Sequence, residues 1–318
     1  MKLLKPERLC IGDTIGIVAP SSAPPDPKAV DRAAVALETF GFRPQLAKNI
    51  RARLGFLAGS DRERAADLMA MFTDKRVKAI LCLRGGYGAA RLLDRLDYAV
   101  IRRHPKILSG YSDITSLHCA LARKVNLVSI HAPMLSGALA DPKVPEFTRR
   151  SFFRTVAEAK PAGGISDGYE GKTVSVLRGG VAEGRLVGGN LSVLCASLGT
   201  PFAPSFAGKI LFLEDIGEKP YRLDRMLTQL LNAGILAQVT GVAVGVNQDC
   251  SDPDAKPGGE YRQSAADVVK ERLSSLRVPV VTGLPFGHVA LNATIPVGVK
   301  ATLDANQGEL IITEAAVS

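Results

Sequence analysis

The chain has 318 residues, 46% of them hydrophobic and 22% charged, which is the composition of a folded globular protein with room for two domains. The formal net charge of +9 suggests an acidic partner. Only 5% of residues are aromatic and tryptophan is absent, which argues against a nucleic-acid-binding protein. A small anionic substrate fits the charge equally well. No apolar run could span a membrane, no signal peptide is evident and the five dispersed cysteines indicate free thiols, so we expect a cytoplasmic enzyme or binding protein.

Strand-like and helical patterns alternate through the first 140 residues. Thr14 to Pro20 is a continuous apolar run that predicts a buried strand, and Ser60 with Glu63 forms a capping box that predicts the start of a helix. This alternation predicts an open, mostly parallel α/β sheet with flanking helices, whose ligands bind beyond the carboxyl ends of the strands. In chain order we expect strand 14–20, helix 28–40, helix 61–71, strand 77–83, helix 89–96, strand 107–110, helix 114–125 and strand 127–131.

Proline and glycine accumulate between residues 141 and 172, around one helical pattern at 146–158, which predicts a linker. The predicted organisation is therefore an α/β domain over 1–140, this linker, and a mixed β-rich domain with a curled sheet over 173–318. In the second domain we expect strands over 173–177, 181–187, 209–214, 238–246, 278–283, 293–302 and 309–313, and helices over 190–198, 219–233 and 261–276.

The turn after the strand 107–110 carries a candidate nucleophile. Ser112 follows Gly110 and precedes a helix whose apolar positions begin at Ile114, so its hydroxyl would lie on a strand-to-helix turn. That geometry is typical of a nucleophile elbow, in which the next backbone N–H faces a developing oxyanion. The match to G-x-S-x-G is partial, because Ile114 stands where the last glycine would be. The alternative is that Ser112 only caps the helix.

A serine nucleophile needs a base, and the sequence holds four histidines. We expect His104 in a charged surface loop and His118 on the far side of the helix that follows Ser112. His131 ends the next strand of the first sheet, whereas His288 lies in a Gly/Pro-rich loop of the second domain. Position alone leaves both of these open.

Glu214 is the outstanding candidate for the carboxylate that orients the base. The four residues before it are large and apolar, so they predict a buried strand that delivers this carboxylate at its end. Asp215 and Glu218 are alternatives. Glu214 could also have a purely structural role and pair with Arg222 or Arg225.

Residues 84–88 form a glycine-rich loop after the strand 77–83. The loop resembles a phosphate cradle but lacks the third glycine of a dinucleotide fingerprint, so a non-catalytic binder of a nucleotide or sugar phosphate is the rival function class. Glycine here could instead let a backbone N–H approach a substrate oxygen closely. The sequence has no H-E-x-x-H, no C-x-x-C and no paired histidines, so we expect no metal site.

Six segments, in order over nearly the whole chain, read GDTIGIVAPSS (12–22), LRGGYG (83–88), GYSDIT (110–115), GGNL (188–191), LED (213–215) and GH (287–288). Together they resemble the LD-carboxypeptidase family of serine peptidases. The resemblance implies a catalytic triad of Ser112, Glu214 and His288, with an oxyanion hole from the backbone N–H groups of Asp113 and Gly86. It also implies a barrel-like second domain, a homodimer and no cofactor.

The family's main activity implies a muropeptide substrate, from which terminal D-Ala is removed during cytoplasmic cell-wall recycling. A side branch, similar to the microcin self-immunity peptidase, cleaves peptidyl-nucleotide antibiotics and stacks the nucleobase on a tryptophan. This chain has no tryptophan, which favours the murein branch, although Tyr or Phe can also stack. An exopeptidase must bind a free carboxylate, and Arg84 is the candidate, with a structural ion pair as the alternative.

Overall fold

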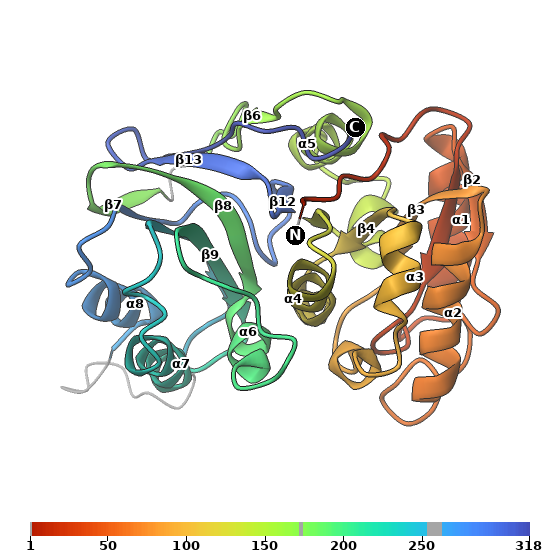
Figure 1. The fold of residues 1–318 in the computed structure, drawn as a ribbon, viewed down its shortest axis with the longest axis horizontal. Helices are drawn as coiled ribbons and strands as arrows, with labels where there is room; N and C mark the ends of the chain where they lie inside the picture. The colour runs from red at the N-terminus through yellow and green to blue at the C-terminus, as the bar shows by residue number, and fades with distance from the viewer. Residues whose placement is uncertain (1, 172–173, 253–262) are drawn as a thin grey trace.

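The computed structural model describes residues 2–171, 174–252 and 263–318. Two β-sheets lie side by side, and helix α4 (Thr115–Lys124) lies between them (Figure 1). Within the described ranges, no helix is both long enough and apolar enough to cross a lipid bilayer. The α/β fold class predicted from the alternating patterns is confirmed.

The first sheet has the strand order β12-β5-β4-β3-β1-β2. Its five N-terminal strands pair in parallel, the arrangement predicted for this sheet. β2 was not predicted and none of its residues is buried, whereas the other four strands are mostly buried because helices cover the sheet. The strands are β1 (Thr14–Val18), β2 (Arg43–Leu46), β3 (Val77–Cys82), β4 (Ile107–Gly110) and β5 (Ser129–His131), and the accompanying helices are α1 (Ala29–Thr39), α2 (Asp61–Thr73) and α3 (Tyr98–Arg103).

Local signals account for most of these elements. The Ser60–Glu63 capping box is present at the start of α2, as predicted. The helix expected over 89–96 is only a 3₁₀ turn, η1 (Ala89–Leu92), and α3 was not predicted. The six residues of α3 are too few to display a helical period, and the helix begins where the Asp97 side chain accepts a hydrogen bond from the backbone N–H of Val100.

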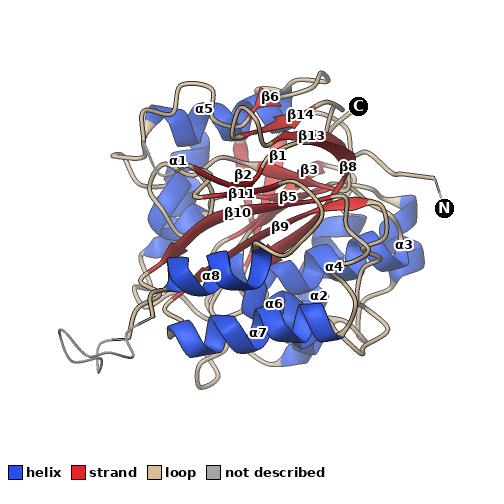
Figure 2. Cartoon of the chain, turned by 90° about the vertical axis from the view of Figure 1, so that its left-hand side faces the viewer, coloured by secondary structure: helices blue, strands red, loops and turns tan. Residues whose placement is uncertain are grey.

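The second sheet has eight strands in the order β6-β14-β13-β8-β9-β10-β11-β7 and is mixed, as predicted. Helices α6 (Leu191–Ser197), α7 (Pro220–Asn232) and α8 (Ala265–Leu273) lie together along one face of this sheet (Figure 2). The first residues of the strand predicted over 173–177 and of the helix predicted over 261–276 lie outside the described residues. The strands are β6 (Gly163–Gly164), β7 (Ser175–Arg178), β8 (Val181–Asn190), β9 (Lys209–Ile216), β10 (Gly241–Gln248), β11 (Val280–Thr282), β13 (Lys300–Asp304) and β14 (Glu309–Ile312).

The single strand expected over 293–302 is two strands that belong to different sheets. β12 (Ile295–Val297) pairs antiparallel with β5 of the first sheet, and β13 pairs with β8 and β14 of the second. The chain turns between them at Gly298, which has a φ of +96°. The C-terminal part of the chain therefore completes the first sheet. The domain boundaries expected from the sequence stay a prediction, although α5 (Glu146–Ala157) forms where the helix near 146–158 was expected.

Gly189 is the point where β8 approaches helix α4. The Thr115 hydroxyl accepts a hydrogen bond of 3.0 Å from the backbone N–H of Asn190. A Cβ on Gly189 would lie 2.5 Å from the Thr115 Oγ1, so only glycine allows this approach. Because Thr115 lies three residues after Ser112, this contact positions the second sheet against the turn that carries the candidate nucleophile.

Gly189→Ala should lower the free energy of unfolding by more than about 2 kcal/mol, since the new methyl group collides with Thr115. Urea unfolding would measure this loss. Gly199→Ala is the matched control, because Gly199 also has a positive φ but its Cβ would meet no atom within 4 Å. That control should lose only about 1–2 kcal/mol from backbone strain. Equal losses in the two variants would contradict the proposed steric role.

His118 joins helix α4 to the first sheet. Its Nδ1 lies 2.8 Å from the Ser129 hydroxyl and its Nε2 lies 2.9 Å from the Gly110 carbonyl oxygen. A carbonyl oxygen only accepts hydrogen bonds, so the proton of the neutral ring is on Nε2. The side chain is fully buried, and burial lowers the pKa of His118 to about 4.

This buried histidine should make the protein sensitive to acid. In the unfolded chain the side chain takes up a proton below its ordinary pKa of 6.5, whereas the folded protein resists protonation down to about 4. Stability should therefore fall as the pH drops through that window, by up to about 1.4 kcal/mol per pH unit from this group. Urea unfolding of His118→Gln should show a shallower decline than the unsubstituted protein, and parallel curves would refute the effect.

Candidate active site

Ser112 lies on a strained turn between β4 and α4. The residue begins the 3₁₀ turn η2 (Ser112–Ile114), and its φ of +60° is one of only three positive values at non-glycine positions in the described part of the chain. Such a conformation costs free energy in an L-residue and is concentrated at functional sites. The alternative that Ser112 caps the helix is wrong, because Tyr111 and Ile114 occupy the N-cap positions and neither makes a side-chain cap.

The glycine-rich loop after β3 lies directly against this turn. A Cβ on Gly85 would lie 3.3 Å from the Ser112 Oγ and 2.9 Å from the Met134 side chain. The side chain of Asp113 is buried and accepts a hydrogen bond of 2.8 Å from the backbone N–H of Ala89. Burial raises the pKa of Asp113, and the hydrogen bonds that it accepts act in the opposite direction. The loop and the turn therefore form one packed unit.

Glu214 and His288 form a hydrogen-bonded pair. Glu214 lies on β9 and is fully buried, and its Oε2 is 2.7 Å from Nδ1 of His288. The His288 side chain is 12% exposed, so the ring is reached from outside while the carboxylate is not. Because Nδ1 donates to the carboxylate, Nε2 is left with its lone pair free to accept a proton.

The alternatives to Glu214 contact other groups. The Asp215 carboxylate accepts hydrogen bonds of 2.9 Å from the Asn190 side chain and from the Ser192 backbone, and burial raises the pKa of Asp215 to about 6. Glu218 pairs with Arg222 on α7, at 3.5 Å. Both carboxylates therefore hold the local fold of the second sheet and its helices together.

The Glu214–His288 pair of the second sheet contacts Tyr111, which lies on the turn after β4 of the first sheet. The centroids of the Tyr111 and His288 rings are 4.5 Å apart, and Tyr111 directly precedes Ser112. Burial and the nearby charge of Glu214 raise the pKa of Tyr111 to about 12, so its hydroxyl stays protonated. The structure thus places the Glu214–His288 pair against the residue that directly precedes Ser112.

His131 occupies a different environment from His288. It is fully buried on β5, its ring contacts Phe212 with centroids 5.3 Å apart, and neither ring nitrogen has a hydrogen-bond partner among the described residues. Burial lowers its pKa well below the ordinary value, so the ring is neutral. His104 is the C-cap residue of helix α3. Of the two histidines left open by the sequence, His288 is the one bound to a carboxylate.

Arg84 lies beside the glycine-rich loop and is partly buried. Its guanidinium donates a hydrogen bond of 2.8 Å to the Ala23 carbonyl oxygen, and in the described ranges it makes no ion pair with a carboxylate. The structural ion pair considered from the sequence is therefore not observed. The described residues also contain no group of three or more His, Cys, Asp or Glu side chains arranged to hold a metal ion.

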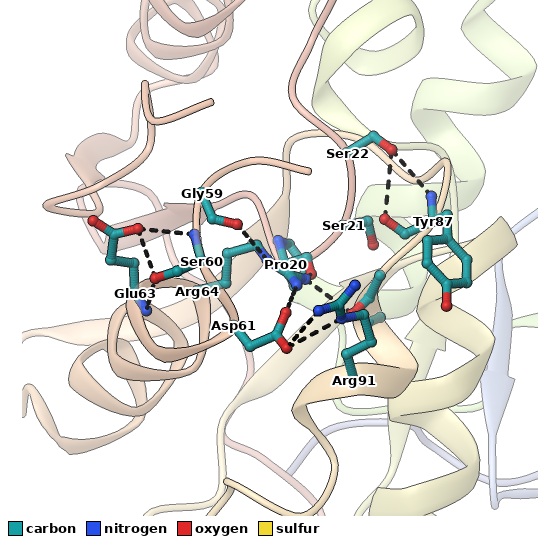
Figure 3. Close-up of polar contacts among 12 residues, drawn as sticks. Pro20, Ser21, Ser22, Gly59, Ser60, Asp61, Glu63, Arg64, Tyr87 and Arg91 are labelled. Carbon is teal, nitrogen blue, oxygen red and sulfur yellow. Dashed lines mark hydrogen bonds and ion pairs between the residues drawn. The ribbon is translucent and has the colours of Figure 1, made fainter. Parts of the chain in front are cut away.

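Two serines after β1 belong to the same region and were missed from the sequence. The Ser21 hydroxyl donates a hydrogen bond to Asp113. The Ser22 hydroxyl accepts one of 3.1 Å from the Tyr87 backbone N–H, as Figure 3 shows. The predicted parallel sheet could have indicated their position. β1, β3 and β4 are parallel neighbours, so the loops after them lie at one edge of the sheet. Pro20-Ser21-Ser22 therefore had to lie near Ser112.

Comparison with known proteins gives the same family as the sequence motifs. The family model of the LD-carboxypeptidase N-terminal domain matches residues 15–132, and that of the C-terminal domain matches residues 183–303. A probable murein peptide carboxypeptidase of Bacillus subtilis is 41% identical over 314 residues, which are 99% of this chain and 95% of that protein.

Solved structures extend the likeness to the fold. A muramoyltetrapeptide carboxypeptidase from Oxalobacter formigenes has a TM-score of 0.81 and 32% identity, with 95% of this chain and 99% of that chain covered. The microcin C7 self-immunity protein MccF of Escherichia coli is 27% identical over 98% of this chain and 96% of that protein. One MccF structure has a TM-score of 0.88 with 25% identity, over 99% of this chain and 100% of that chain. This protein therefore belongs to the LD-carboxypeptidase family and is a serine-type carboxypeptidase.

Proposed function

We propose that this enzyme removes the terminal D-Ala from murein tetrapeptides by hydrolysing the amide bond that follows an L-centre. The observation that carries the proposal is the Glu214–His288 pair held against the strained Ser112 turn. The relatives named as murein peptide and muramoyltetrapeptide carboxypeptidases support the substrate class. The family resemblance supports the further proposals that the enzyme acts in cytoplasmic cell-wall recycling, needs no cofactor and forms a homodimer.

In the proposed mechanism, Ser112, His288 and Glu214 act as nucleophile, base and orienting carboxylate. Glu214 holds the proton on Nδ1 of His288, so Nε2 takes the Ser112 proton as the hydroxyl oxygen attacks the amide carbonyl. The His288 imidazolium then protonates the departing amine of D-Ala, and an acyl-enzyme remains on Ser112. Water, deprotonated by the same imidazole, releases the acyl product.

Two backbone N–H groups are proposed to hold the oxyanion. The N–H of Asp113 follows the nucleophile on the turn η2, and the N–H of Gly86 lies on the loop that packs against Ser112. One such donor is worth roughly 10²–10³ in rate. Arg84, which lies beside this loop, is proposed to bind the free carboxylate of the substrate.

A second candidate function is cleavage of a peptidyl-nucleotide, because the fold is also similar to MccF. The chain lacks tryptophan, but Phe56 and Tyr87 form an aromatic pair, with ring centroids 5.6 Å apart and 63% and 52% of each residue exposed. Tyr87 directly follows Gly86, so the pair could stack a nucleobase near the proposed oxyanion hole. Incubation with both substrates would separate the two functions.

Ser112→Ala should retain the fold and lose roughly 10⁴-fold or more in kcat, because it removes the hydroxyl proposed to form the acyl-enzyme. Mass spectrometry of a tetrapeptide digest would detect the loss of one alanine. Ser109→Ala is the matched control, since this hydroxyl is buried on β4 and has no hydrogen-bond partner in the described part of the chain. Near-normal turnover by Ser112→Ala would end the proposal.

The base is tested separately. His288→Asn should lower kcat by about 10³-fold or more, because it removes the group that accepts the Ser112 proton. His131→Asn should leave most of the activity, since that ring is buried and bonded to no carboxylate. Steady-state kinetics on a tetrapeptide would rank the two variants, and the reverse ranking would reassign the base to His131.

A further inference from the structure

Arg64 on helix α2 is buried beneath the glycine-rich loop and uses its guanidinium to hold three separate backbone segments (Figure 3). Only 2% of the residue is exposed. It donates hydrogen bonds to the carbonyl oxygens of Gly88 at 2.9 Å, Gly59 at 3.3 Å and Pro20, and it pairs with Asp61. An arginine is rarely buried to this extent unless it is paired, and here all three guanidinium nitrogens have a partner.

The Asp113 carboxylate holds the same loop one residue further on. Its Oδ2 accepts hydrogen bonds from the Ala89 backbone N–H at 2.8 Å and from the Ser21 hydroxyl. Arg64 and Asp113 therefore hydrogen-bond to the two polar groups of one peptide unit, the Gly88 carbonyl and the Ala89 N–H. The two side chains are 2% and 3% exposed, so water does not compete for these bonds.

Ser22 fixes the other end of the loop. Its backbone N–H donates a hydrogen bond of 3.1 Å to the Gly85 carbonyl oxygen, and its hydroxyl accepts one of 3.1 Å from the Tyr87 N–H. The peptide group between Gly85 and Gly86 is planar and trans, so a carbonyl turned toward Ser22 makes the Gly86 N–H point away from it. Gly86 packs tightly against Ser22, since a Cβ on Gly86 would lie 2.5 Å from the Ser22 Oγ.

We propose that Arg64 is a positioning residue for the oxyanion hole: with Asp113 it locks the Gly88–Ala89 peptide, and thereby keeps the Gly86 N–H aimed at the developing oxyanion. The proposal rests on the proposed function in that it takes Gly86 as an oxyanion donor. A donor that is held in place before the reaction stabilises the transition state more than the bound substrate, so its loss lowers kcat rather than raising KM.

Arg64→Lys tests this role, because lysine keeps the positive charge but cannot reach three carbonyl oxygens with one ammonium group. The variant should lose about 10- to 100-fold in kcat on a murein tetrapeptide, while KM changes by less than about threefold. Arg91→Lys is the matched control. Arg91 is 43% exposed and pairs with the same Asp61 at 3.0 Å, but it contacts none of the three carbonyl oxygens, so kcat should not change.

A second readout does not depend on turnover. Hydrogen exchange at the backbone amides of Tyr87 and Ala89 should become faster in Arg64→Lys and stay unchanged in Arg91→Lys. Should Arg64→Lys fail to fold, Ser21→Ala is the second variant, because it removes the hydroxyl that donates to Asp113. It should also speed exchange in the loop and lower kcat, but by less than Arg64→Lys. Unchanged exchange in the loop, or a loss that falls on KM, would overturn the positioning role.

Phosphonylation of Ser112 by a fluorophosphonate separates this inference from the proposed function. The Ser112 oxygen bonds to phosphorus, fluoride leaves and the serine proton goes to His288. Negative charge also develops on the phosphoryl oxygen at the site, so the rate of this reaction should fall by a similar factor in Arg64→Lys. An unsubstituted protein that is phosphonylated but releases no D-Ala would refute the murein substrate and leave the role of Arg64 measurable. A protein that is not phosphonylated at all would refute both proposals.

Discussion

The contact between Glu214 and His288 is the interaction on which the candidate site depends. A carboxylate that is completely removed from water is tolerated only with a partner, and here the partner is Nδ1 of the imidazole at 2.7 Å. β9 fixes the carboxylate in the middle of the second sheet. The loop after β11 must then pass close over it, and Gly287 permits this, since a Cβ there would lie 3.3 Å from Glu214. The pair therefore depends on the loop after β11 lying against β9.

The first sheet is held to the second part of the chain by three contacts. The Tyr111 ring lies against His288, and Thr115 receives the backbone N–H of Asn190 from β8. β12, from the C-terminal part of the chain, pairs with β5. These contacts sustain the left-handed backbone of Ser112, a conformation that persists only when its surroundings over-determine it.

Hydrogen bonds among the loops at the edge of the first sheet are a second constraint on the candidate site. The loops after β1, β3 and β4 interlock through Ser22, Arg64 and Asp113, and all three hold backbone or carboxylate groups that would otherwise be unpaired. The bonds that Arg64 and Asp113 make in this network are buried, so water does not compete for them and the loops are held rigidly. Rigidity at this edge suits a site in which backbone N–H groups must face a charge that exists only during the reaction.

The sequence by itself determined the local features: the buried strands, the capping box of α2, the turn that carries Ser112, and the buried run that ends at Glu214. Periodicity and turn chemistry report on neighbours along the chain, and these features depend on such neighbours alone. Only the tertiary structure showed that His288, and not His131, is bonded to Glu214, that β12 belongs to the first sheet and that Arg64 lies under the glycine-rich loop. Each of these depends on groups far apart in the sequence, 74 residues in the case of Glu214 and His288, and no local pattern encodes which distant side chain will meet which.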